Sequence, residues 1–129
     1  MVPAGENANY NGVFDEVGLV IIATQDGTTV DIDADANGLF ETQVVLDEGE
    51  THVIYGGLSL GADVHSDKPV SAYMPTGDHG ATYEGRLFEL YPTSIWANDM
   101  LSPVGSQASG DETRVFLYNP GGSAIDVDV

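Results

Sequence analysis

Short apolar runs separated by turn residues recur along the whole chain, and helical periodicity is nearly absent. Turn signals spaced about 8–12 residues apart are typical of β-sandwiches and barrels. We therefore predict an all-β fold, an antiparallel β-sandwich of Greek-key or jelly-roll type with about eight to ten short strands. The expected strands cover residues 18–24, 28–33, 40–46, 51–55, 62–66, 70–74, 86–90, 114–118 and 124–129.

Local patterns add detail to this prediction. Asp26-Gly27 is a strong hairpin turn, so we expect residues 18–24 and 28–33 to pair. Alternation along residues 29–33 places Val30 and Ile32 inward and the intervening carboxylates outward. One short helix is expected over residues 92–99, with Trp96 facing the core.

Charge restricts the function more than any motif does. The chain has three Lys and Arg against 21 Asp and Glu, for a formal net charge of −18. Nucleic-acid binding and attachment to anionic membrane surfaces both require basic patches, so both are excluded. With no Cys, disulfides and thiolate chemistry are excluded as well. Such mutual repulsion indicates a protein adapted to high salt or to bound divalent cations.

The domain plan has three parts: an N-terminal extension or linker over 1–16, a β-sandwich module over 17–110 and a final hairpin over 111–129. A shift of 95 residues places 20–22 over 115–117 and 27–33 over 122–128, with apolar, Gly and Asp positions in common, although two acidic hairpins can share such a pattern by chance. The final hairpin therefore either begins a second repeat or closes the same sandwich. The first residues lack a signal-peptide pattern, which suggests a removed leader or a piece of a longer protein.

Oxygen-bearing side chains stand at every second position from 31 to 37, followed by Gly38. This spacing matches the first half of an EF-hand-like loop, although Val44 stands where the final Glu would be. An acidic hairpin turn with Asn37-Gly38 at positive φ explains the same letters without a metal. The ligand set expected for a calcium ion is Asp31, Asp33, Asp35, Asn37 and Glu41.

No catalytic motif is present, so we do not expect an enzyme. The serines lack a nucleophile motif, and the histidines lack zinc-site spacing. The nearest approach to an acid–base cluster is Asp78 and His79 with Glu84 and Arg86. A carbohydrate-binding module is an alternative, because exposed aromatic rings stack on sugars; the candidates are Tyr73, Tyr83, Tyr91 and Trp96.

Five segments resemble the N-terminal type domain of IgGFc-binding proteins and its microbial surface relatives. They are residues 22–30, 45–51, 66–70, 86–96 and 113–117, in an order that spans roughly residues 17–129. The resemblance implies an extracellular, all-β, repeat-forming surface or adhesion module. The animal members are Cys-rich and this chain has no Cys, which favours a microbial relative.

Together these features predict a non-enzymatic structural or adhesion module at the cell surface of a halophilic microbe, part of a tandem array or filament. The expected partners are other copies, neighbouring modules or surface glycans, without direct membrane insertion. An edge strand carrying Ala124, Ile125 and Val127 is expected to pair with a neighbouring copy. A viral coat or filament subunit is a further alternative.

Overall fold

The computed structural model describes residues 1–2, 4–8, 14–78, 80, 85–97, 117, 119 and 121–128. The chain divides into two compact units, Met1–Trp96 and Ala97–Val129. The strand expected at 114–118 lies outside the described residues, apart from Leu117.

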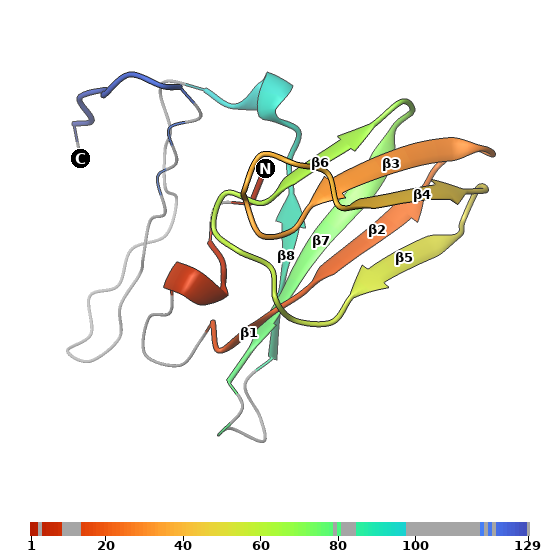
Figure 1. Cartoon of the computed structure of the whole chain (residues 1–129), viewed down its shortest axis with the longest axis horizontal. Helices are drawn as coiled ribbons and strands as arrows, with labels where there is room; N and C mark the ends of the chain where they lie inside the picture. Colours follow the sequence, from red (N-terminus) through yellow and green to blue (C-terminus); the bar gives the residue numbers. More distant parts are fainter. Residues whose placement is uncertain are drawn as a thin grey trace. The chain divides into compact units, whose positions relative to one another are not determined.

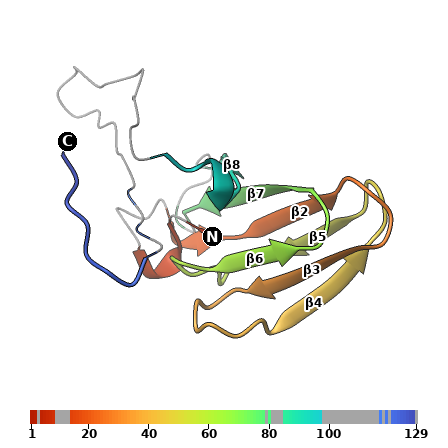
Figure 2. The ribbon, with the colours of Figure 1, turned by 90° about the horizontal axis from the view of Figure 1, so that it is seen from above.

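The first unit consists of two antiparallel sheets facing each other (Figures 1 and 2). In the five-stranded sheet β7 pairs with β1, β2 and β8, and β2 pairs with β5; in the three-stranded sheet the order is β4-β3-β6. This confirms the predicted all-β sandwich. The strands are β1 (Glu16–Val17), β2 (Leu19–Ala23), β3 (Thr28–Asp33), β4 (Thr42–Leu46), β5 (Thr51–Ile54), β6 (Asp63–Ser66), β7 (Val70–Gly77) and β8 (Gly85–Leu90).

The core lies between the two sheets. Residues of β2 and β3 alternate between the inner and outer faces up to Ile32, so the predicted inward positions of Val30 and Ile32 are confirmed: both are fully buried. The predicted outward position of Asp33 is wrong, because its carboxylate accepts backbone N–H groups of the following loop and is only 4% exposed. The buried apolar residues are Val2, Ala4, Phe14, Val17, Leu19, Ile21, Ala23, Val30, Ile32, Leu46, Leu58, Ala62 and Met74.

Three short connections cross from one sheet to the other at the same end of the sandwich, which we call the crossing end (Figure 2). They are residues 24–27 from β2 to β3, 47–50 from β4 to β5 and 67–69 from β6 to β7. The predicted β2–β3 hairpin is therefore wrong. Both edges of β2 are already paired, with β5 and β7, so the Asp26-Gly27 turn carries the chain into the opposite layer.

Carboxylates hold the crossing end together. Gly27 N donates to Asp47 Oδ1 at 3.0 Å, and Thr29 N donates to Asp67 Oδ1 at 2.8 Å. The Lys68 ammonium donates to the Gly27 carbonyl at 3.0 Å. These acidic side chains satisfy backbone N–H groups that the turns leave without a strand partner, so they contribute more than a solvated surface.

The N-terminal residues belong to the sandwich. We expected residues 1–16 to be an extension or linker, but Val2, Ala4 and Phe14 are buried in the core. Val2 N donates to the Ala62 carbonyl at 2.8 Å, and Gly61 N donates to the Val2 carbonyl at 2.9 Å. Isolated apolar residues among Gly and Asn give no periodic signal, and this is why the sequence did not reveal the packing.

Only one 3₁₀ turn, η2 (Thr93–Ile95), forms in the described part of the expected 92–99 helix. Trp96 follows it in an extended conformation, with ψ of 137°, which ends the turn. Trp96 is half-buried and Ile95 is 62% exposed. The apolar residues around Trp96 therefore do not enclose it as a core residue.

In the second unit, the described residues 121–128 form no strand. Ala124, Ile125 and Val127 are all exposed, and Ile125 is 60% accessible. Over residues 124–128 the expected strand is thus absent from the structure. An extended segment becomes a strand only by pairing with another, and no pairing involves these residues.

Candidate metal site

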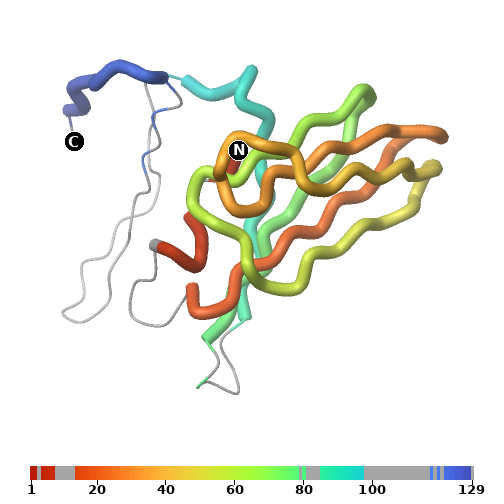
Figure 3. The backbone as a smooth tube through the Cα atoms, viewed as in Figure 1, coloured from red at the N-terminus to blue at the C-terminus, as the bar shows by residue number. Residues whose placement is uncertain are grey.

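The loop between β3 and β4 brings three carboxylates together. Asp33 ends β3, Asp35 lies within the loop, and Glu41 directly precedes β4. One carboxylate oxygen from each lies within 4.8 Å of the other two. Ile32 pairs with Thr42 as the last pair of the hairpin, so residues 33 and 41 stand beside each other where the strands part. The loop doubles back at the end opposite the crossing end (Figure 3).

Asp33 organises the loop backbone. Its carboxylate accepts hydrogen bonds from Asn37 N at 3.1 Å and from Gly38 N at 2.8 Å. Asp33 is only 4% exposed, so these bonds are shielded from water. The loop backbone is therefore hydrogen-bonded to this one carboxylate, which is the buried member of the cluster.

The other loop side chains are also held in place. Asp35 accepts from Asn37 N at 3.1 Å and from the Asn37 side-chain amide at 3.0 Å. Asn37 Oδ1 in turn accepts from Leu39 N at 2.8 Å. Glu41 Oε2 accepts from Ala34 N at 3.2 Å, across the mouth of the loop. The cluster is thus positioned by hydrogen bonds before any ion binds.

The structure groups three of the five expected ligands. Asp31 lies outside the cluster, because it precedes Asp33 by two residues within β3. There the Gln43 side chain donates to it at 2.6 Å. Asn37 lies in the loop but is bonded to Asp35. Positive φ occurs at Gly38 (88°), as the turn interpretation predicted, but its second position is Ala36 (63°) and not Asn37.

Three carboxylates in one loop could hold a metal ion. They supply hard oxygen ligands and formal charge, whereas imidazole and thiolate ligands are missing from the cluster. Hard cations such as Ca²⁺ and Mg²⁺ prefer ligands of this kind, and carbonyl oxygens and water complete their coordination shells.

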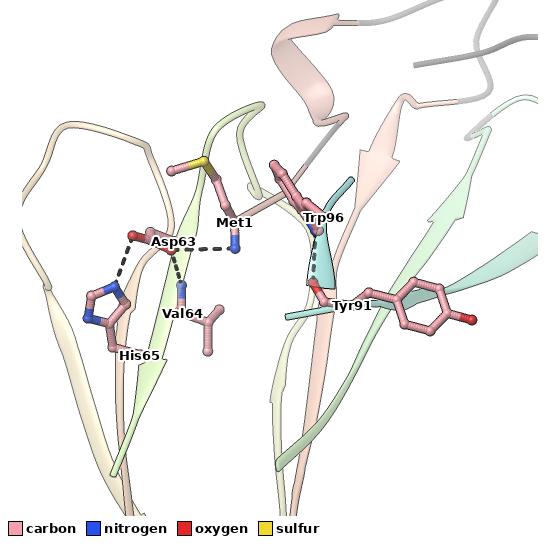
Figure 4. A network of polar contacts seen from close by, with 6 residues as sticks. All are labelled: Met1, Asp63, Val64, His65, Tyr91 and Trp96. Atoms are coloured by element: carbon pink, nitrogen blue, oxygen red, sulfur yellow. Dashed lines mark hydrogen bonds and ion pairs between the residues drawn. The ribbon is translucent and has the colours of Figure 1, made fainter. Parts of the chain in front are cut away.

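A second polar network lies on β6 (Figure 4). Asp63 is 3.4 Å from the terminal amine of Met1 and 3.2 Å from His65 Nε2, and the Phe40 ring packs against His65 at 5.0 Å. His65 is largely exposed, at 64% of its side chain, so the network is a surface contact. Of the predicted Asp78–His79 cluster, His79 and Glu84 lie outside the described residues.

Among the described residues, the rings of Tyr91 and Trp96 do not form a shared stacking surface. Trp96 Nε1 donates to the Tyr91 carbonyl at 3.3 Å, but the two rings point in different directions (Figure 4). The charge of Glu89, together with a hydrogen bond to it, raises the pKa of the exposed Tyr91. Tyr73 is half-buried on β7, and Tyr83 lies outside the described residues. The three candidate rings that the structure describes therefore give the carbohydrate-binding alternative no assembled site.

Among the described residues, no helix has the length and apolar character needed to cross a membrane. In comparisons with known proteins, no family model, no curated protein and no solved structure matches the chain. The resemblance to the IgGFc-binding domain therefore stays a prediction.

Proposed function

We propose that the protein is a non-enzymatic structural or adhesion module of an extracellular, salt-adapted surface, and that its β3–β4 loop binds calcium. The observation that carries this proposal is the convergence of Asp33, Asp35 and Glu41 in a loop already folded around Asp33. The site lies on a rigid two-sheet scaffold, which suits a stabilising ion better than a sensing one.

Hairpin geometry explains how a shortened EF-hand-like loop suits calcium. In an EF-hand the chain leaves the loop in a helix, and the last carboxylate comes from position 12. Here the chain returns along β4, so Glu41, at position 9 when counted from Asp33, already faces the first ligand. Calcium tolerates irregular sets of six to eight oxygens, whereas magnesium demands a near-ideal octahedron. The open, carboxylate-rich loop therefore favours calcium.

Calcium titration tests the site directly. We expect calcium to raise the melting temperature of the full chain, since a ligand at 100 times its Kd adds about 2.7 kcal/mol to the free energy of unfolding. The double variant Asp35→Asn/Glu41→Gln removes two exposed ligands and should abolish the shift. Isothermal titration calorimetry and thermal melts in moderate NaCl provide the measurements.

A matched control separates the site from general charge effects. Asp31→Asn/Glu48→Gln removes the same two charges outside the cluster, from a half-buried position on β3 and an exposed position at the crossing end. This control should retain the full calcium response. Equal binding heats in the wild type and in the Asp35/Glu41 variant would refute a calcium site in the loop.

Salt dependence tests the proposed habitat. With a net charge of −18, the folded chain repels itself, and raising NaCl from 0.15 M to about 2 M shortens the screening length from about 8 Å to less than 3 Å. We expect the melting temperature to rise by about 5–10 °C across this series. Sucrose at matched osmolality controls for solute exclusion. A melting temperature indifferent to NaCl contradicts salt adaptation.

A further inference from the structure

The β2–β3 unit, residues 20–33, supplies an inner strand to each layer of the sandwich. β2 is paired on both edges in the five-stranded sheet, and β3 is paired on both edges in the three-stranded sheet. The connection between them therefore joins inner strands of the two layers. A second copy of the β2–β3 sequence pattern would need partner strands as well, because a unit whose two strands are paired on both edges cannot fold alone.

The structure shows which residues the crossing requires. Gly27 has φ of 62°, a conformation that favours glycine. Thr28 is fully buried, and its hydroxyl donates to the Gln25 carbonyl at 2.7 Å. Val30 and Ile32 fill the core.

Residues 115–128 retain each of these requirements. Gly122 stands for Gly27, and Ser123 keeps the hydroxyl of Thr28. Apolar side chains and carboxylates alternate as in β3, with the same spacing and length. The full set of equivalent positions in this part of the unit is Gly122, Ser123, Ile125, Asp126, Val127 and Asp128.

The described residues of this segment, 121–128, form no strand. They belong to the separate compact unit Ala97–Val129. Ile125 and Val127 are 60% and 49% exposed, whereas their counterparts Val30 and Ile32 are fully buried. A segment with the inward pattern of a central strand thus has its apolar side chains in water.

Strand direction limits how the first sandwich could absorb it. β6 and β8 form neighbouring edges, and both run toward the crossing end. Two strands joined by a tight turn run in opposite directions, so one of them would have to pair in parallel there. At the other side, β4 runs toward the crossing end and β5 away from it, so both pairings could be antiparallel. That arrangement is the alternative that an experiment must distinguish.

We propose that residues 115–128 are the β2–β3 unit of a second sandwich, completed by a further copy of strands β4 to β8. The interaction partner of this segment is therefore another copy of the same module. Asp128 stands at the position of Asp33. The inference rests on the proposed structural function only for its biological setting, and its tests are made in EDTA so that calcium binding does not affect them.

A transplant tests the equivalence of the two units. In the full chain, residues 20–33 are replaced by the sequence of residues 115–128, which has the same length. We expect the transplanted chain to keep a cooperative transition at a lower melting temperature, because the apolar pattern is retained while Tyr118 takes the buried place of Ala23 and Phe116 that of Ile21. A control carrying the same 14 residues in scrambled order should lose the cooperative transition. A transplant that behaves like the scrambled control overturns the proposal.

A smaller sequence exchange controls for the case in which the transplanted chain fails to fold only because its side chains pack poorly. Replacing only residues 28–32 by residues 123–127 introduces Thr28→Ser, Thr29→Ala, Val30→Ile and Ile32→Val. These are conservative in volume, so we expect a shift of no more than about 5 °C. Loss of cooperative unfolding in this chain would also count against the proposal.

Charge insertion distinguishes a second sandwich from closure of the first. Ile125→Asp/Val127→Asp should leave the melting temperature within about 2 °C of the wild type, because exposed substitutions have small effects. The matched pair Val30→Asp/Ile32→Asp should abolish cooperative unfolding, because it buries charge in the core. If the Ile125/Val127 variant melts more than about 10 °C lower, the segment closes the first sandwich and the proposal is wrong.

Completion of the second sandwich gives the positive test. A chain extended after Val129 by a copy of residues 35–97 supplies the strands that follow β3. We expect a second protease-resistant unit, and Ile125→Asp/Val127→Asp should now abolish that unit alone. An extension that remains as protease-sensitive as an unfolded tail contradicts the proposal.

Discussion

Asp33→Ala is expected to lower the free energy of unfolding by about 3 kcal/mol in metal-free buffer, a large effect for a single loop residue. The carboxylate accepts hydrogen bonds from Asn37 N and Gly38 N, and it is buried. Truncation leaves these two donors without their charged acceptor. Urea denaturation in EDTA measures the loss.

Asp31→Ala is the matched control for this prediction. Asp31 lies on the same strand, and its carboxylate accepts a hydrogen bond from the Gln43 side chain instead of backbone N–H groups of the loop. Its replacement should cost less than about 1 kcal/mol. Equal losses in the two variants would show that Asp33 does not organise the loop, and would weaken the case for a prearranged metal site.

Gly5→Ala is expected to destabilise the fold by about 3 kcal/mol, through a clash with backbone atoms. A Cβ at Gly5 would overlap the backbone of Ser59 and Leu60, neither of which can move aside as a flexible side chain can. Thermal and urea unfolding of the full chain measure this effect. The result tests whether the N-terminal residues are a structural part of the sandwich.

Gly85→Ala serves as the control, because nothing lies within 4 Å of a Cβ at that position. Its effect should stay within about 0.5 kcal/mol. If Gly5→Ala were equally mild, the N-terminal segment would not pack against residues 58–60 as the structure shows. The original expectation of a linker over residues 1–16 would then stand.

Much of the fold could be predicted because the strands follow simple patterns. The bounds of β3 agree with the expected residues 28–33, since alternating apolar and acidic residues define one inner and one outer face. Strand partners could not be predicted in the same way. The Asp26-Gly27 turn indicates a change of direction but contains no information on whether the next strand joins the same sheet, which depends on β5 and β7 occupying the edges of β2.

The spacing of the candidate ligands could be predicted from the sequence, but not which of them form the cluster. Asp33, Asp35 and Glu41 converge because the hairpin returns the chain within a few residues. Asp31 has the same spacing in the sequence but lies within the paired part of β3, where the chain is extended and not turning. The residue at which the loop begins to turn depends on backbone conformation, including the positive φ of Ala36. The residue type alanine gives no indication of that conformation.

Three connections join the two sheets at the crossing end, and residues 55–62, from β5 to β6, join them at the opposite end. Separating the layers at the crossing end requires the bonds between Gly27 and Asp47 and between Thr29 and Asp67 to break together. At the opposite end, Ser59 N donates to the Ala34 carbonyl at 2.9 Å, which ties the β5–β6 connection to the residue that follows Asp33. A cation bound at Asp33 would therefore act where one connection joins the sheets instead of three, and hydrogen exchange at the Ser59 amide should slow when calcium is added.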